Sequence, residues 1–171
     1  MNLARPDEHL ADPSDRQARG AKGACMTHVL HPGDVICVER GERVETLLGS
    51  CVAIVLTDAR RSIAAVCHLV HAGAGATTAY GGCALQAMEA MLRARGFNAR
   101  LCEAFVYGGG NMFPVLAPGD QHVGMSNVRW ALSELAGRGM PVLAQDVGGD
   151  GYRRFAWTVG PGMPEVVQLR G

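Results

Sequence analysis

The stretch CVAIVLTDARRSIAAVCHLV, residues 51–70, decides the fold because it contains two short apolar runs joined by one charged turn. Both runs are rich in β-branched residues and bounded by turn residues, which is typical of β-strands. Runs of the same kind precede it at residues 34–39 and 43–48. The first half of the chain, from Val29 onward, is therefore predicted to be rich in β-structure.

The second half of the chain adds helices. Three apolar residues recur at helical spacing in GGCALQAMEAMLRARGF, residues 81–97, and Gly96 marks the end of that helix. A second helix is predicted at residues 126–139, with Ser126 or Asn127 as its N-cap. Further strands are predicted at residues 99–107, 140–147, 154–159 and 165–170. Because strands often follow one another without an intervening helix, we expect an α+β fold with helices on one side of a mixed sheet.

Length and composition predict one domain with a tail. The chain has 171 residues, enough for one continuous hydrophobic core. Residues 1–26 contain almost no large apolar side chains and cannot bury enough surface to offset chain entropy. They are predicted to form a flexible tail, and residues 27–171 to form the single folded domain.

Charge and cysteine content narrow the class of protein. Sixteen basic and sixteen acidic residues cancel, and Lys22 is the only lysine, so no electrostatic argument favours binding to nucleic acid or a membrane. The first residues lack the apolar core of a signal peptide, and no run reaches bilayer length. The six cysteines include no Cys-x-x-Cys pair, which disfavours a zinc site or a disulfide framework and favours a reduced, cytoplasmic protein.

Hairpin counting places a thiol opposite an imidazole. If Ala59 and Arg60 are the two central residues of the turn, Cys51 pairs with His68. Directly opposed residues of an antiparallel pair share one face and have Cβ atoms about 4.5–5.5 Å apart. The pattern therefore predicts a Cys-His dyad, in which the histidine takes the thiol proton and the sulfur attacks an electrophilic carbonyl. His71 is the rival base.

The residues before Cys51 fit this chemistry. Gly49 and Ser50 allow a sharp turn that exposes the sulfur and directs backbone N–H groups towards a developing oxyanion. A third group usually orients the base, and Thr46 and Glu45 are the candidates, on opposite faces of a straight strand. The alternative is an inert, packed cysteine, because cysteine is among the most buried residue types.

Two further features carry alternative interpretations. The GGGN run at residues 108–111, which includes Gly109, lacks the lysine of a P-loop and is predicted to be a tight turn that brings backbone near the site. Arg153 either makes a structural contact or faces the substrate, since a guanidinium matches carboxylates on an acidic partner.

Successive blocks of the chain carry a family resemblance. The blocks TLLGSCVAIVLTD, YGGCALQAMEAMLRARG, AFVYGGGNMF, VGMSNV and AQDVGGDGYRRF occur in that order between residues 29 and 170. Together they resemble the CheD family of bacterial chemotaxis, whose members hydrolyse the side-chain amide of chemoreceptor glutamines to glutamate and ammonia. Because several blocks must coincide, this resemblance is more specific than the dyad alone.

The resemblance implies roles for individual residues. Cys51 matches the family's nucleophile and His68 its general base. Family members place a Thr or Ser just upstream as a third residue; here Glu45 stands six positions before Cys51, and the hydroxyl is on Thr46. Phe105 stands where the family commonly has Lys, which predicts an altered surface or pocket contact.

The resemblance also implies a fold, partners and cofactor use. The family fold is a layered α/β/β sandwich related to toxin deamidases, without a metal or organic cofactor. The loops at residues 108–111 and 124–127 would lie near the cleft, which gives Asn127 an alternative to capping. The implied partners are the cytoplasmic helices of methyl-accepting chemotaxis receptors and, for some relatives, a CheC-like phosphatase.

Three functions follow. The leading hypothesis is a cytoplasmic glutamine deamidase acting on chemoreceptors. The alternative is a non-catalytic chemotaxis adaptor that binds receptors or a CheC-like phosphatase. A third is a thiol hydrolase of small amides or esters.

Overall fold

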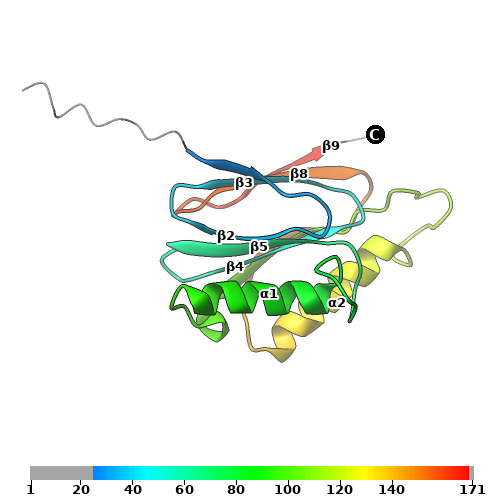
Figure 1. Cartoon of the computed structure of the whole chain (residues 1–171). Coiled ribbons are helices and arrows are strands. Elements are labelled where there is room, and N and C mark those ends of the chain that lie inside the picture. Colours follow the sequence, from blue (N-terminus) through cyan, green and yellow to red (C-terminus); the bar gives the residue numbers. More distant parts are fainter. Residues whose placement is uncertain (1–24, 170–171) are drawn as a thin grey trace, which may run out of the picture.

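The computed structural model describes residues 25–169, whose strands form two sheets (Figure 1). One sheet has the order β1 (Thr27–Val29), β3 (Arg43–Leu48), β8 (Tyr152–Thr158), β9 (Glu165–Leu169). The other has the order β2 (Val35–Glu39), β5 (Ile63–Leu69), β4 (Val52–Thr57), β6 (Glu103–Gly108), β7 (Val142–Val147). Each sheet contains one parallel pair, β1 with β3 and β6 with β7, so both are mixed. The predicted tail lies outside the described residues except for Cys25 and Met26.

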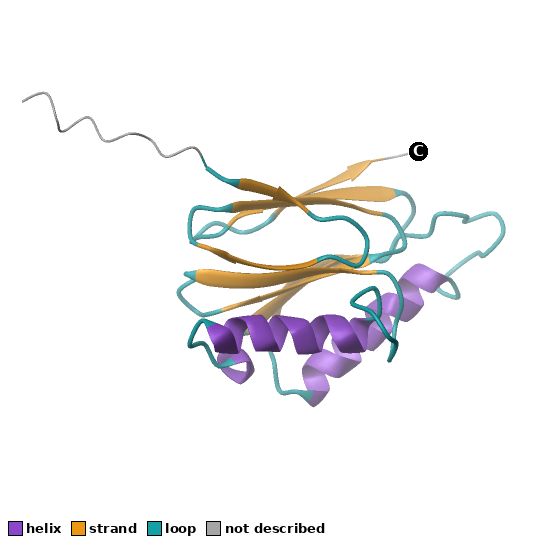
Figure 2. Ribbon diagram, in the orientation of Figure 1, coloured by secondary structure: helices purple, strands orange, loops and turns teal. Residues whose placement is uncertain are grey.

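The layers follow the order helix, sheet, sheet. Helices α1 (Gly81–Ala94) and α2 (Val123–Gly137) cover one face of the five-stranded sheet, and the four-stranded sheet packs on its other face (Figure 2). A short 3₁₀ helix, η2 (Ala99–Leu101), precedes β6. The predicted α+β class and its layered α/β/β arrangement are confirmed.

Two apolar clusters fill the two spaces between the layers. One lies between the helices and the five-stranded sheet, and it includes Ile54, Cys67 and Leu85. The other lies between the sheets, and it includes Val55 and Phe105. Strands β4 and β5 are buried along their whole length because both of their faces are covered.

Phe105 belongs to the inner layer rather than to a surface or pocket. It is fully buried between the sheets, and its ring meets the edge of Trp157 at a centroid distance of 5.8 Å. This position suits an apolar side chain, because burying an unpaired charge between the sheets would cost free energy. The expectation of an altered surface or pocket contact at this position is therefore wrong.

The hairpin of β4 and β5 has a longer turn than predicted. The Asp58 carboxylate accepts backbone N–H groups of Ser62 and Ile63, at 2.6 and 3.1 Å, and so stabilises a wider turn. The register then pairs Ala53, not Cys51, with His68. The predicted Cys51–His68 pair is wrong by two residues, and an even shift preserves the face on which a side chain lies.

The first helix ends where predicted, but the second does not begin there. Helix α1 stops at Ala94, and Gly96 follows with a φ of 83°. Helix α2 begins at Val123, with the His122 ring accepting the N–H of Met125 as N-cap. Neither Ser126 nor Asn127 is therefore the cap.

Residues 99–101, predicted as strand, form the 3₁₀ turn of η2. Within residues 25–169, no helix combines the length and the apolar character needed to cross a membrane.

Candidate active site

The segment Gly49-Ser50-Cys51 is the crossover between the two sheets, because β3 belongs to one sheet and β4 to the other. The loop after β6 holds it in place. Gly109 donates its N–H to the Cys51 carbonyl, and Gly110 donates to the Gly49 carbonyl, both at 2.8 Å. The predicted tight turn at residues 108–111 thus lies directly against the candidate nucleophile.

Gly108 permits this close contact. Its φ is 108°, which disfavours any residue with a side chain, and a Cβ atom there would overlap the carbonyl oxygen of Cys51. The end of β6 and the crossover can therefore approach this closely only through glycine.

Asn127 joins the crossover to the end of β5. Its amide nitrogen donates to the Ser50 carbonyl at 3.1 Å and to the Val70 carbonyl at 2.9 Å. The residue is 1% exposed. It lies on the buried side of α2 with Ala131 and Leu135, four and eight positions later. That helical spacing was the available sign that Asn127 faces inward rather than capping the helix.

His68 lies between the sheets and contacts Thr46 of the opposite sheet. His68 Nδ1 is 2.8 Å from Thr46 Oγ1, and Thr46 Oγ1 is 2.8 Å from the Leu30 carbonyl oxygen. A carbonyl can only accept, so the hydroxyl donates to Leu30 and accepts the Nδ1–H of His68. This arrangement assigns the ring proton to Nδ1 and leaves the lone pair on Nε2.

The Nε2 atom of His68 is buried and has no hydrogen-bond partner among the described residues. A buried polar nitrogen without a partner is uncommon in a folded protein, and a catalytic role is one explanation for it. This nitrogen is the one that can take a proton.

The two candidates for the orienting residue point in opposite directions. Thr46 is buried on the inner face of β3, together with Val44 and Leu48. Glu45 lies on the outer face, where its carboxylate accepts from Arg43 Nε at 2.7 Å. Only Thr46 of the two contacts His68.

Cys51 is half-buried and packs against the apolar cluster between the sheets. Burial raises the pKa of its thiol. Burial also lowers the pKa of the His68 imidazole, and the nearby Leu30 carbonyl opposes this shift in part. Near neutral pH both groups are therefore neutral, and a proton must move before the sulfur can act as a nucleophile. The rival base, His71, is exposed and packs on the Tyr80 ring at 4.9 Å.

Arg153 lies opposite Leu48 in the register of β3 and β8. Its side chain is 4% exposed, and its Nε donates to Asp146 Oδ1 at 2.9 Å. Because Asp146 belongs to β7, this ion pair connects the two sheets. Of the two roles predicted for Arg153, the structure therefore shows the structural contact.

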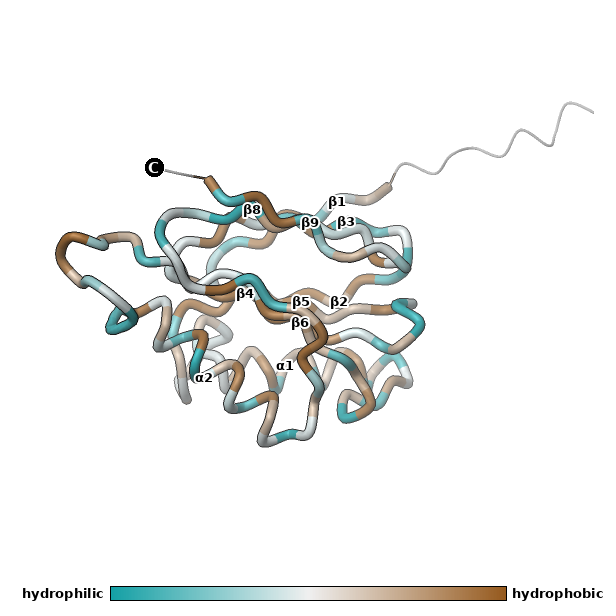
Figure 3. The backbone as a smooth tube through the Cα atoms, turned by 180° about the vertical axis from the view of Figure 1, so that it is seen from behind, coloured by the Kyte–Doolittle hydropathy of each residue, from teal (hydrophilic) through white to brown (hydrophobic). Residues whose placement is uncertain are grey.

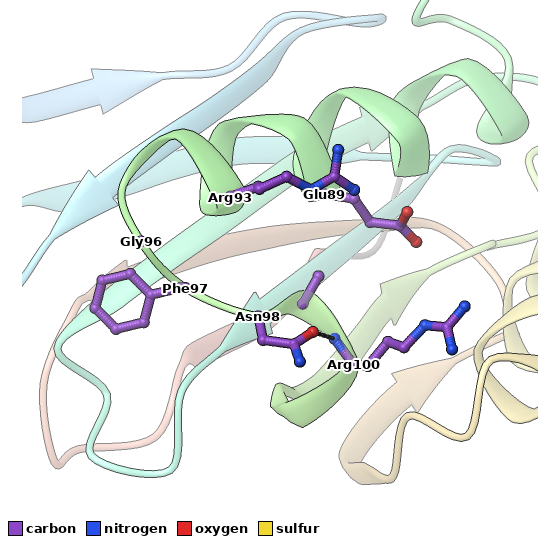
Figure 4. A pocket seen from close by; sticks show the side chains of 7 residues that line it. Glu89, Arg93, Gly96, Phe97, Asn98 and Arg100 are labelled. Carbon is purple, nitrogen blue, oxygen red and sulfur yellow. Dashed lines mark hydrogen bonds between the residues drawn. The ribbon is translucent and has the colours of Figure 1, made fainter.

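One surface hollow lies beside the crossover, and another lies far from it. One of about 320 Å³ is lined by Ser50, Met112, Phe113 and Val123, and so opens beside the crossover. The other, of about 390 Å³, lies at the C-terminal end of α1 between Arg93 and Arg100 (Figure 4). Helix α1 starts next to Tyr80 and has 14 residues, so the second hollow is roughly 20 Å from the crossover end. None of the residues that line it was predicted for the site.

Clusters of three or more His, Cys, Asp or Glu side chains that could hold a metal ion do not occur in the described part of the chain.

Comparisons with known proteins give consistent relatives. A family model described as CheD chemotactic sensory transduction matches residues 69–166. A protein of Albidiferax ferrireducens named "Probable chemoreceptor glutamine deamidase CheD 2" is 33% identical over 141 residues, which cover 78% of this chain and 82% of that protein. A Pseudomonas savastanoi pv. phaseolicola protein named "Probable chemoreceptor glutamine deamidase CheD" is 36% identical over 138 residues, 77% of this chain and 78% of that protein. A relative from Anaeromyxobacter dehalogenans, "Probable chemoreceptor glutamine deamidase CheD 1", is 32% identical over 170 residues, with 97% and 96% coverage.

Proposed function

The chain belongs to the CheD family, and we propose that it is a protein-glutamine deamidase that converts chemoreceptor glutamines to glutamate and releases ammonia. One observation carries the proposal beyond the family names. The buried Nε2 of His68 lacks a partner, and the Thr46 hydroxyl fixes the ring proton on the other nitrogen. An imidazole held in this tautomer is prepared to act as a general base.

The proposed reaction starts from the neutral pair. His68 Nε2 takes the proton of Cys51 while the sulfur attacks the carbonyl carbon of the glutamine side chain. The protonated Nε2 then gives its proton to the departing nitrogen, and ammonia leaves as a thioester forms on Cys51. His68 next takes a proton from water, whose oxygen attacks the thioester carbon. The C–S bond then breaks, glutamate leaves, and His68 returns the proton to the Cys51 sulfur.

The surrounding residues supply position and charge stabilisation in this proposal. Thr46 orients the His68 ring, as the third member of such a group does. The N–H of Cys51 contributes to binding the oxyanion. Gly49 and Ser50 form the turn before the nucleophile, and Gly109 and Asn127 hold that turn in place. Arg153 supports the site indirectly, by holding the sheet that carries Thr46.

A direct test is incubation of a receptor cytoplasmic fragment with the protein, followed by peptide mass spectrometry. We expect glutamine to be converted to glutamate at selected sites by the wild type and not by Cys51→Ala. Cys83→Ala is the matched control, because Cys83 is also a half-buried free cysteine, but it belongs to α1 and its Sγ donates to the Gly75 carbonyl, whereas Cys51 packs on the cluster between the sheets. Conversion by Cys51→Ala, or none by the wild type, would contradict the proposal.

A non-catalytic adaptor with the same fold is the alternative, and thiol reactivity separates the two. A working Cys51 is expected to react with iodoacetamide with help from His68, so its alkylation should slow in His68→Ala while that of Cys83 stays unchanged. An alkylation rate of Cys51 that is the same in the wild type and in His68→Ala would favour the adaptor.

A further inference from the structure

The loop between β6 and α2 exposes several large apolar side chains. Phe113 is 68% exposed, Val115 91%, Leu116 82% and Val123, at the start of α2, 60%. Figure 1 shows this loop projecting from the layered body at the end where β3 crosses to β4, and Figure 3 shows its outer tip coloured as hydrophobic. We call residues 112–117 together with Val123 the apolar rim.

The backbone of the apolar rim is tied down by hydrogen bonds. The buried Asn111 donates its amide N–H to the Ala117 carbonyl at 2.6 Å, and its side-chain oxygen accepts the N–H of Phe113 at 3.0 Å. Leu116 and Ala117 both donate to the Phe113 carbonyl at 3.0 Å. The chain therefore orders this segment while leaving its apolar side chains in water. Exposed large apolar side chains grouped on one ordered segment in this way indicate an interaction surface.

The apolar rim is continuous with the candidate active site. Met112 packs on the crossover, since its sulfur would lie 2.9 Å from a Cβ atom on Gly49. The hollow of about 320 Å³ is lined by Phe113 and Val123 of the apolar rim and by Ser50 of the crossover. Met112 also lines a second hollow, of about 640 Å³, together with Pro114 and Tyr152.

We propose that the apolar rim docks the glutamine-bearing helix of the chemoreceptor through apolar side chains of that helix, an inference that rests on the proposed function. A glutamine side chain has only two methylene groups, so the helix that carries it must come close to the crossover. Residues three or four positions away lie on the same helix face, about 5–6 Å from the glutamine. These residues would then cover the hollow between Ser50 and Phe113. We expect the receptor helix to carry apolar residues three or four positions away from each glutamine that is modified.

Binding is tested without turnover in a Cys51→Ala background. Phe113→Asp and Leu116→Asp are expected to weaken binding of a receptor cytoplasmic fragment about tenfold or more, because a charge replaces an apolar contact at the centre of the interface. Leu101→Asp is the matched control, since Leu101 is 78% exposed on η2 and lines a hollow at the other end of α1. Isothermal titration calorimetry gives the dissociation constants, and thermal melts compare folding.

Turnover separates failure of this inference from failure of the proposed function. In the wild-type background the two rim variants are expected to raise KM for receptor glutamines while kcat and the alkylation rate of Cys51 stay unchanged. If the wild type modifies no receptor, the proposed function itself fails. If it does, and the rim variants match Leu101→Asp, the docking surface is wrong. Loss of self-association in sedimentation velocity with unchanged receptor affinity would instead identify the rim as a contact between copies of this chain.

Discussion

The position of one proton on His68 depends on two groups that are distant from it in the sequence. The Thr46 hydroxyl commits its own proton to the Leu30 carbonyl, so it can only accept from the ring. The glutamate next to Thr46 faces outward and has no such contact. The Thr46 hydroxyl orients the His68 ring because it donates one hydrogen bond and accepts another at the same time.

Replacing the hydroxyl by a methyl group tests this chain of hydrogen bonds. Thr46→Val keeps the shape of the side chain but leaves the buried Nδ1–H of His68 without an acceptor, at a cost of about 1–3 kcal/mol in the free energy of unfolding. We expect kcat for glutamine conversion to fall by roughly 10²-fold or more, as when general-base catalysis is lost. Thr46→Ser should restore much of it, and Glu45→Gln should match the wild type. An unchanged kcat in Thr46→Val would contradict the role.

The pH dependence follows from the two shifted pKa values. The base must be neutral, and burial lowers the pKa of His68 below its ordinary 6.5, so the acid limb of kcat/KM should have its midpoint below pH 6.5. The thiol must start protonated, and burial raises the pKa of Cys51 above 9.0, so the alkaline limb should lie above pH 9. Alkylation of Cys51 should still be accelerating as the pH passes 9. A plateau in alkylation rate at pH 7 or below would instead indicate a preformed thiolate-imidazolium pair.

The sequence predicts which segments around the site are strands or helices. It does not predict the register in which the strands pair or the residue at which α2 begins. Strands β4 and β5 and helix α1 follow from short-range hydrophobic periodicity, which is a local property. The hairpin register was missed because the Asp58 carboxylate stabilises a longer turn than the simplest one. The start of α2 was missed because His122 acts as the N-cap, outside the usual set of capping residues.

The end of β6 offers a test at the level of elements. Gly108→Ala places a Cβ against the Cys51 carbonyl at a φ of 108°, which should cost about 1–3 kcal/mol or more and displace the crossover. Deamidation and the His68-assisted alkylation of Cys51 should both fall. Gly137→Ala in α2 is the control, because nothing lies within 4 Å of a Cβ there, and alanine is favoured over glycine in a helix by up to about 1 kcal/mol. Equal stability of the two variants would show that the contact with the crossover is unimportant.

The whole molecule depends on the two sheets being held in one relative position, because Thr46 and His68 lie on different sheets. The apolar cluster between the sheets supplies most of this attachment. The ion pair of Arg153 with Asp146 adds a directional contact between β8 and β7. Its guanidinium is buried, so it requires a partner.

Removing that partner should destabilise the fold. Asp146→Ala leaves the Arg153 guanidinium buried and unpaired, which should lower the free energy of unfolding by about 1–3 kcal/mol, less than for a fully buried pair because Asp146 is half exposed. Chemical denaturation measures the change, and Arg153→Met combined with Asp146→Ala should recover most of it. Glu165→Ala removes the exposed partner of Arg43 and should change stability by no more than about 0.5 kcal/mol. A larger loss in Glu165→Ala than in Asp146→Ala would be contrary to this account.

Local pattern by itself determined strands β2 to β9 and the two long helices in their order, and the Gly-Ser-Cys turn before a buried strand, because each depends on residues close together in the chain. Only the tertiary structure decided that Thr46, not Glu45, contacts His68 and that Asn127 joins Ser50 to Val70. Those contacts connect strands of different sheets and a helix far along the chain. They depend on register and layer packing, which are fixed by turn chemistry and by the burial of both sheets at once.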